Sequence, residues 1–208
     1  MKKRHPHKLP RKKPSPLLRA FSWVYGQSLV RYSEVMYVAP HPDSSALHGV
    51  SLCINSGARG VRQTLAVMRS LVRQYRTDLG LLSTARNLIF LAPEKDEMAE
   101  AECLFRFVRD QIRYTRDIHD VETVSSPDKT LAFQCGDCDD KTTLLATLAE
   151  CVGFPTRFVV TGYSAPGQYE HVYLQLLVNN RWVSADPTEP QNLGWEPPGA
   201  VARMIEGK

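Results

Sequence analysis

The segment Gln134–Lys141, with the sequence Gln-Cys-Gly-Asp-Cys-Asp-Asp-Lys, constrains the fold more than any other stretch of the chain. Gly136 provides a turn, and the turn delivers Cys138 to the start of a helix that we predict over residues 139–151. Aspartates suit the first turn of a helix, and a Gly-Phe-Pro sequence ends this one. The apolar residues of the segment follow the stripe of a buried helix face: Leu144, Leu145, Leu148, Cys151 and Val152. The sequence therefore predicts a core helix with a thiol at its N-terminus.

The thiol of Cys138 is a candidate nucleophile. A cysteine at a helix N-terminus lies at the positive end of the helix dipole, which favours the thiolate form. The carboxylates of Asp139 and Asp140 oppose this effect. The site therefore needs a further cation, and histidine is the side chain best suited to provide it.

A predicted β-hairpin downstream supplies a histidine and a carboxylate. Residues 171–178 form an extended, mostly apolar run, and residues 181–186 form the return strand, which Pro187 ends. Between them, Asn179 and Asn180 suit a two-residue turn because asparagine tolerates positive φ.

The length of this turn determines which side chains share a face of the hairpin. A two-residue loop pairs the residues that flank it and, counting back, pairs Tyr173 with Asp186. His171 then lies on the face of Tyr173 and diagonal to Asp186, roughly 7–8 Å away at the backbone. A four-residue loop keeps this parity, whereas a three-residue loop would turn one strand over. The chain can thus place a base beside Cys138 and an orienting carboxylate behind the base.

These motifs resemble those of the transglutaminase-like superfamily of papain-like cysteine enzymes, over about residues 93–190. The matching segments are Gly136-x-Cys138-x-Asp140, Gly153–Val159, Gly162-Tyr163, His171-Val172 and Trp182–Thr188, with Phe107–Tyr114 and Ser126–Leu131 upstream. The resemblance implies an α+β fold. In that fold a helix carrying the cysteine packs on an antiparallel sheet carrying the histidine and aspartate, here with an N-terminal helical extension.

The resemblance also implies a reaction. Cys138 would attack an amide or peptide carbonyl of a protein or peptide substrate, His171 would move the proton, and Asp186 would orient the imidazole. The backbone N–H of Cys138 would bind the oxyanion, and Gln134 is a candidate side-chain donor. Transfer of the acyl group to water gives a peptidase or amidase, and transfer to an amine gives a transglutaminase. The sequence leaves both open, although the bacterial and phage relatives favour hydrolysis. No metal or cofactor is expected.

The Gly-Asp-Cys-Asp-Asp motif, with a helical segment before it, is most similar to versions from tailed phages and prophages. The resemblance therefore implies phage structural proteins as partners and the virion as a destination after synthesis. Animal crosslinking enzymes carry an aromatic residue after the cysteine, where this chain has acidic residues. This departure leaves the substrate and the acyl acceptor open.

The charge of the chain is concentrated at its beginning. The net charge is +4, but eight of the 26 Lys and Arg residues lie in residues 1–20, which hold no Asp or Glu, so the remaining 18 face 22 acidic residues. Prolines interrupt this arm, which we predict to be extended and to serve either as a solvated tail or as a contact for nucleic acid or acidic protein surfaces. No run is apolar enough to span a membrane, and five scattered cysteines indicate synthesis in a reducing cytoplasm.

Four segments follow from these patterns: a basic arm (1–28), a mainly helical extension (29–92), the transglutaminase-like core (93–190) and a C-terminal tail (191–208). The extension is predicted to hold a strand over 50–54 and helices over 61–75 and 79–91. The first helix has Arg62, Arg69 and Arg73 on its outer face. A further helix begins with Pro93 at its first position. Its predicted buried stripe is Met98, Ala101, Phe105, Val108 and Ile112.

The sequence leaves two alternative functions open. Cys135 and Cys138 form a Cys-x-x-Cys pair at a helix start, as in dithiol oxidoreductases, but this alternative leaves His171 and Asp186 without a role. A zinc site would need a second ligand pair, and the remaining cysteines are solitary. The second alternative is a structural component of a phage particle that docks through the basic arm, with little catalysis.

Overall fold

The structure is a computed structural model, and it describes residues 35–38, 50–53, 57–116 and 124–206. The helices are α2 (Gly57–Tyr75), α3 (Leu79–Ile89), α4 (Glu97–Gln111), α5 (Pro127–Phe133) and α6 (Cys138–Cys151). The strands are β1 (Val35–Val38), β2 (Val50–Cys53), β3 (Arg113–Tyr114), β4 (Cys135–Gly136), β5 (Thr156–Gly162), β6 (His171–Val178), β7 (Arg181–Ala185) and β8 (Ala202–Ile205). The basic arm lies outside the described residues.

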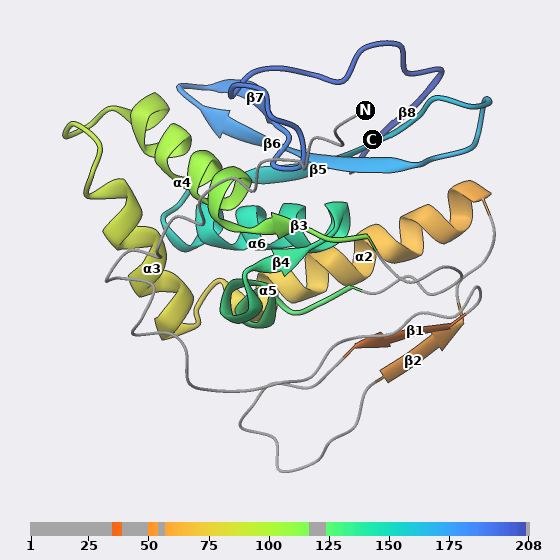
Figure 1. The fold of residues 1–208 in the computed structure, drawn as a ribbon, viewed down its shortest axis with the longest axis horizontal. Helices are drawn as coiled ribbons and strands as arrows, with labels where there is room; N and C mark the ends of the chain where they lie inside the picture. Colours follow the sequence, from red (N-terminus) through yellow and green to blue (C-terminus); the bar gives the residue numbers. More distant parts are fainter. Residues whose placement is uncertain (1–34, 39–49, 54–56, 117–123, 207–208) are drawn as a thin grey trace, which may run out of the picture.

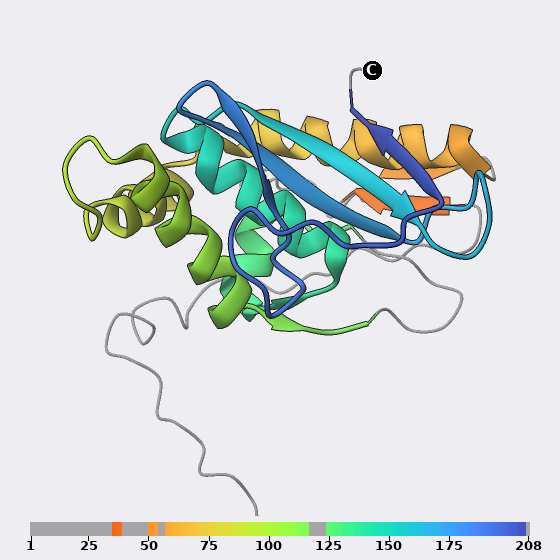
Figure 2. The ribbon, with the colours of Figure 1, turned by 90° about the horizontal axis from the view of Figure 1, so that it is seen from above.

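A four-stranded antiparallel sheet, in the order β7-β6-β5-β8, lies along one side of α6 (Figure 1). Helices α2, α3, α4 and α5 pack around the rest of α6, and Figure 2 shows α2 running alongside the sheet. Two short pairings complete the fold: β1 with β2 antiparallel, and β3 with β4 parallel. The predicted α+β class, with the cysteine helix packed on an antiparallel sheet, is therefore confirmed.

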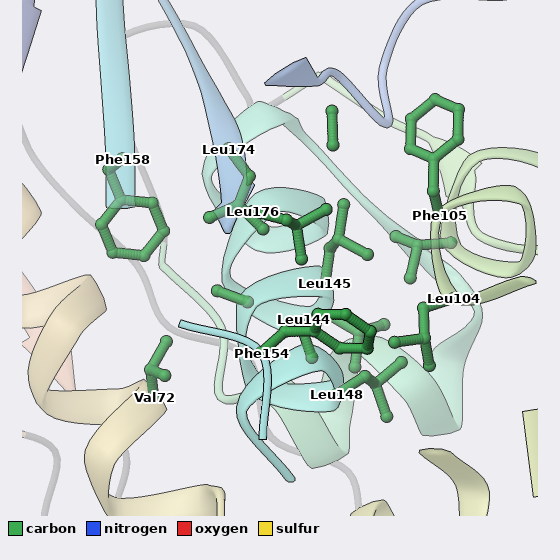
Figure 3. Packing of buried hydrophobic residues seen from close by; sticks show 14 of the residues in the cluster. Val72, Leu104, Phe105, Leu144, Leu145, Leu148, Phe154, Phe158, Leu174 and Leu176 are labelled. Carbon is green, nitrogen blue, oxygen red and sulfur yellow. The ribbon is translucent and has the colours of Figure 1, made fainter. Parts of the chain in front are cut away.

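Helix α6 is buried on all sides and not only along the predicted stripe. Every residue from Asp140 to Ala149 is buried. Threonines fill part of the second face, and two of their hydroxyls find acceptors: Thr147 Oγ1 donates to the Thr143 carbonyl at 2.8 Å, and Thr142 Oγ1 donates to the Val172 carbonyl at 3.3 Å. The Thr143 hydroxyl is buried without a hydrogen-bond partner among the described residues. Figure 3 shows the leucines of α6 between the apolar side chains of the sheet and those of α2 and α4. The helix is thus clamped between two layers, and its N-terminus has a fixed position.

The hairpin of β6 and β7 has the predicted turn and register. Asn179 and Asn180 both have positive φ, of 48° and 60°, as a two-residue hairpin turn requires. Val178 pairs with Arg181, and the register continues to Leu174 opposite Ala185. Extended by one step, this register places Tyr173 opposite Asp186, in agreement with the sequence analysis.

The front helices join the same core, with one correction to α2. Leu65, Met68, Leu71 and Val72 of α2 are buried in this core. Arg69, predicted to lie on the outer face, instead has a side chain only 12% exposed. Its guanidinium donates to both carboxylate oxygens of Glu206, at 2.7 and 2.6 Å, and to Glu150. The positive charge could not be placed from periodicity because its partners come from two distant segments.

The prediction that α4 begins at Pro93 is wrong. Lys95 has a φ of 63°, which a right-handed helix cannot include, and Asp96 caps the helix by accepting from the N–H of Ala99 at 3.0 Å. The helix therefore begins at Glu97. Met98, predicted to be buried, is 41% exposed; Leu104, which the predicted stripe omits, is fully buried.

The predicted C-terminal tail contains a strand. Residues 202–205 form β8, which pairs antiparallel with β5 at the edge of the sheet. Glu206 follows it, accepts the N–H of Phe158 at 3.1 Å and binds Arg69. The sheet therefore extends beyond residue 190. Residues 35–38, which lie in the extension predicted to be mainly helical, form β1.

Candidate active site

A tight turn between β4 and α6 fixes the position of the candidate nucleophile. Asp137 is the N-cap of α6, and its Oδ1 accepts the backbone N–H groups of Asp139 and Asp140 at 3.0 and 3.1 Å. Cys138 is the first residue of the helix. The predicted start at residue 139 is thus one residue late, and Asp137 supplies the cap that the sequence analysis did not assign.

The glycine of the motif allows the helix to approach the preceding strand closely. A Cβ built at Gly136 would lie 2.5 Å from the Cβ of Asp140, a distance that real atoms do not reach. The carboxylate of Asp140 is buried and binds the incoming chain. It accepts the Ser125 N–H at 2.6 Å and lies 3.3 Å from the Ser125 hydroxyl. Gly136 and Asp140 therefore form one structural unit that sets the start of α6.

The surroundings of the Cys138 thiol favour its protonated form. Burial raises the pKa of Cys138 well above its ordinary value, and the carboxylates of Asp139 and Asp137 raise it further. The sulfur lies 3.6 Å from Oδ1 of Asp139. Only the backbone N–H of Val172 acts in the opposite direction. Burial is the largest cause of the raised pKa, and the aspartates recognised in the sequence act in the same direction.

The contacts of Val172 bring the N-terminal end of α6 to the first residues of β6. Its N–H points to the Cys138 sulfur, and its carbonyl accepts the Thr142 hydroxyl. His171 is the preceding residue on the strand. Cys138 and His171 are 33 positions apart in sequence, and the contacts of Val172 bring their two segments together.

His171 and Asp186 are in direct contact. Nε2 of His171 lies 2.7 Å from Oδ2 of Asp186, and their side chains are 17% and 1% exposed. The ring of His171 also stacks on Tyr173, with the ring centroids 6.3 Å apart. The contact predicted from hairpin parity is confirmed. Because Nε2 faces the carboxylate, Nδ1 is the ring nitrogen left to exchange a proton elsewhere.

Thr188 fixes the orientation of the Asp186 carboxylate. The backbone N–H and the hydroxyl of Thr188 both donate to Oδ1 of Asp186, at 3.0 and 2.6 Å. Oδ1 is thereby occupied, and Oδ2 is directed to His171. The Asp-Pro-Thr sequence carried a signal for this contact, since a threonine two residues after an aspartate often bonds back to it.

The other predicted site residues lie nearby in sequence but have less defined roles. Gln134 is the C-cap of α5, has a φ of 54°, and its carbonyl accepts the N–H of Arg113 at 2.8 Å. Cys135 lies in β4 and, like Cys138, is a free thiol. Tyr114 of β3 stands opposite Gly136, is 45% exposed, and has a pKa raised by burial and by Cys138. The sequence carried no signal for a role of Tyr114.

Neither a metal site nor a membrane-spanning helix is found within the described part of the chain. Its His, Cys, Asp and Glu side chains do not gather in any group of three or more that could hold a metal ion. None of its helices combines the length and apolar content needed to cross a bilayer.

Comparison with solved structures places the fold among known ones. A candidate protease of Parabacteroides distasonis matches with a TM-score of 0.51 and 10% identity, over 80% of this chain and 38% of that chain. A candidate cysteine protease of Cytophaga hutchinsonii matches at a TM-score of 0.45 and 13% identity, over 84% of this chain and 71% of that one. LapG of Legionella pneumophila matches at a TM-score of 0.45 and 20% identity, over 65% of this chain and 80% of that chain. This chain thus spans well under half of the first of these proteins.

Comparison of the sequence identifies the family. No curated protein matches the chain. The family model of the transglutaminase-like superfamily matches residues 84–187, which is half of the chain and includes Cys138, His171 and Asp186. The similarity to tailed phages inferred from the motif stays a prediction. With its cysteine helix packed on an antiparallel sheet and its matching sequence, the chain belongs to the transglutaminase-like superfamily.

Proposed function

We propose that this protein is a cysteine enzyme that cleaves or transfers the acyl group of an amide in a protein or peptide substrate, with Cys138, His171 and Asp186 as its catalytic triad. The observation that carries the proposal is the contact between His171 and Asp186. A buried carboxylate with one oxygen occupied by Thr188 and the other directed to an imidazole has the geometry of an orienting group.

In the proposed first step, the Cys138 sulfur attacks the carbonyl carbon while its proton passes to Nδ1 of His171. The raised pKa of Cys138 favours this coupled transfer over a thiolate formed in advance. The carbonyl oxygen gains the negative charge. When the carbon–nitrogen bond breaks, His171 returns the proton to the leaving amine, and a thioester remains on Cys138.

The backbone N–H of Cys138 is suited to bind the oxyanion. The side chain of Asp137 accepts the N–H groups of Asp139 and Asp140, and the Lys141 N–H donates to the Asp137 carbonyl at 3.1 Å. Among the described hydrogen bonds, none uses the N–H of Cys138, so this donor at the positive end of α6 can serve the substrate. The side chain of Gln134 remains a candidate for the second donor.

The fate of the thioester distinguishes two activities. Attack by water, with His171 as the base, gives a carboxylic acid and makes the protein a peptidase or amidase. Attack by an amine gives a new amide and makes it a transglutaminase. We propose hydrolysis as the main outcome, following the bacterial and phage relatives that the motifs resemble.

A peptide carrying a cysteine-directed electrophile, such as an epoxide, tests the nucleophile without knowledge of the natural substrate. We expect labelling at Cys138, mapped by peptide mass spectrometry, and we expect it to be lost in His171→Ala. Cys135→Ala is the matched control, because it removes a free thiol three positions away, and it should label like the wild type. Once a cleaved peptide is found, adding a primary amine shows how the thioester partitions between water and amine.

Labelling that is equal at all cysteines, or unchanged in His171→Ala, would contradict the proposal. A reducible disulfide between Cys135 and Cys138 would instead favour the dithiol alternative. The alternative of a phage assembly component, and any contact of the basic arm with nucleic acid, depends on residues 1–28. These lie outside the described residues, so both stay predictions.

A further inference from the structure

The imidazole of His171 is held to Asp186 by one hydrogen bond, which does not by itself fix the plane of the ring. Nε2 lies 2.7 Å from Oδ2 of Asp186, and 17% of the His171 side chain is exposed. The torsion that joins an imidazole to its Cβ has broad minima, so a ring bonded at one nitrogen can still tilt. A second contact is needed to keep the ring in one orientation.

Tyr173 provides this second contact. It lies two residues after His171 on β6, and side chains two positions apart on a strand point to the same face. Its ring stacks on the imidazole with the centroids 6.3 Å apart and the planes 24° from parallel, within the range where aromatic rings attract each other. The register of the hairpin also makes Tyr173 the cross-strand neighbour of Asp186. The tyrosine ring therefore lies beside both members of the pair.

A polar network holds Tyr173 on the side away from the imidazole. Arg203 of β8 donates to the tyrosine hydroxyl at 3.4 Å and to Oε1 of Glu196 at 3.0 Å. The same oxygen of Glu196 accepts Nε2 of Gln175 at 2.9 Å and the hydroxyl of Ser184 at 2.5 Å. Gln175 and Ser184 are buried, and Tyr173 is only 1% exposed. The tyrosine ring thus has no room to move away from His171.

The hydroxyl of Tyr173 stays protonated under assay conditions. Burial raises the pKa of Tyr173 to about 12, and the charge of Glu196 acts in the same direction. A phenol with this pKa does not exchange its proton with a neutral imidazole near pH 7. Any contribution of Tyr173 to the reaction therefore comes from the position of its ring.

We propose that Tyr173 is a positioning residue for the reaction: its buried ring holds the His171 imidazole against Asp186, so that Nε2 stays on the carboxylate while Nδ1 exchanges the proton. Proton transfer requires such precision, because an error of about an ångström in the position of a reacting group can lower a rate about 100-fold. This inference rests on the proposed function, since it concerns the same imidazole.

Two substitutions separate the ring of Tyr173 from its hydroxyl. Tyr173→Leu removes the stacked ring, whereas Tyr173→Phe keeps it. The measured quantity is the rate of His171-dependent labelling of Cys138 by the peptide electrophile. We expect Tyr173→Leu to react about 10- to 100-fold more slowly than the wild type, and Tyr173→Phe to stay within about threefold of it.

Nitrogen-15 NMR of the imidazole gives a readout that a merely structural role would not move. At a pH where the ring is neutral, the wild type and Tyr173→Phe should carry the His171 proton on Nε2. Tyr173→Leu should show a mixture of the two tautomers, because the imidazole can then turn away from Asp186. An unchanged tautomer in Tyr173→Leu would overturn the proposal.

Phe158→Leu is the matched control. Phe158 is fully buried on β5, but it packs on the opposite face of the sheet, where the Arg69 guanidinium lies over its ring. This variant loses a ring of similar size, so its stability should fall comparably. Its labelling rate and its tautomer should stay those of the wild type at a temperature where it is folded. Equal slowing in Phe158→Leu and Tyr173→Leu, or equal slowing in Tyr173→Phe and Tyr173→Leu, would contradict a role of the stacked ring.

A measurement on the wild type keeps the proposal testable if Tyr173→Leu does not fold. We expect nuclear Overhauser effects between the ring protons of His171 and those of Tyr173, and a single tautomer of His171. Absence of these effects, or two tautomers in the wild type, would overturn the proposal. Failure of the proposed function has a different signature, which is wild-type labelling of Cys138 that does not depend on His171.

Discussion

Nε2 of His171 lies 2.7 Å from Oδ2 of Asp186, while Thr188 occupies the other oxygen of the same carboxylate with two donors. This arrangement determines the tautomer of the His171 imidazole as well as its distance from Asp186. A carboxylate that can only accept requires a proton on Nε2 of the imidazole, and so leaves Nδ1 without one. The orientation of Asp186 therefore selects the tautomer in which His171 can accept a proton from a thiol.

Asp186→Asn should abolish most of the activity with little loss of fold. Thr188 would hold the amide oxygen in the place of Oδ1, so the amide NH₂ would point at Nε2 and force the proton to Nδ1. We expect the rate of Cys138 labelling, or of hydrolysis once a substrate is known, to fall by about 10²- to 10⁴-fold.

Asp96→Asn is the matched control, because asparagine caps a helix about as well as aspartate and the site is on another element. It should leave both rate and melting temperature nearly unchanged. If Asp186→Asn kept more than half of the wild-type rate, His171 would not need the tautomer that Asp186 selects.

Asp139→Asn should make Cys138 react faster with iodoacetamide. The Asp139 carboxylate helps to raise the pKa of the thiol, so removing its charge lowers that pKa and increases the thiolate fraction at any pH below it. We expect a rate increase of roughly two- to tenfold at pH 8. Cys103 on α4 serves as the internal reference in the same sample, because its surroundings do not include Asp139. A fast rate that is constant below pH 7 and lost in His171→Ala would show instead a thiolate–imidazolium pair formed in advance.

The hairpin and the cysteine helix could be predicted because their determinants are local. Asn179 and Asn180 specify the turn, the turn fixes the register, and the register places His171 beside Asp186. Likewise, a turn glycine and aspartates near a helix start indicate where a helix begins, to within one residue for α6. These features depend on residues a few positions apart, which a single sequence displays.

The features that the sequence did not predict depend on distant partners. Strand β8 is four residues long and is stabilised by pairing with β5, about 40 positions earlier. Arg69 is predicted to lie on the outer face of its helix, yet its side chain is only 12% exposed because acceptors from other elements surround it. Lys141, for which the sequence carries no burial signal, is buried for the same reason. Helical periodicity assigns a charge to the outer face, and it cannot detect a carbonyl or carboxylate supplied from elsewhere.

Arg69→Ala should destabilise the protein strongly. The guanidinium neutralises Glu150 and Glu206, donates to Thr156, and lies over the Phe158 ring at 4.7 Å. Its removal takes from Glu206 its cation and leaves Glu150 only Arg76, at 3.6 Å. We expect a loss of about 3 kcal/mol in the free energy of unfolding, measured in urea. Because Glu206 follows β8, limited proteolysis should also cut near residue 200 sooner than in wild type.

Arg73→Ala, on the exposed face of the same helix, is the control, and it should change the free energy of unfolding by no more than about 0.5 kcal/mol. Equal effects of the two substitutions would mean that the Arg69 contacts contribute no more than a surface charge.

Gly136→Ala should impair the site even where the protein still folds. The added methyl group would meet the Cβ of Asp140 at 2.5 Å, and that atom is attached to the backbone of α6 and cannot rotate away. The strand or the helix must therefore move, and the Ser125 contacts of Asp140 and the position of Cys138 move with it. We expect a loss of about 1–3 kcal/mol in stability and a fall in Cys138 labelling measured at a temperature where the variant is fully folded.

Gly80→Ala is the control for this substitution. At Gly80 a methyl group would meet only the end of the Asp78 side chain, at 3.2 Å, and alanine favours the helical backbone of α3. Its stability should stay within about 1 kcal/mol of the wild type, with labelling unchanged. Full labelling of Gly136→Ala would show that the start of α6 can shift by about an ångström without cost, and that Gly136 serves only the turn.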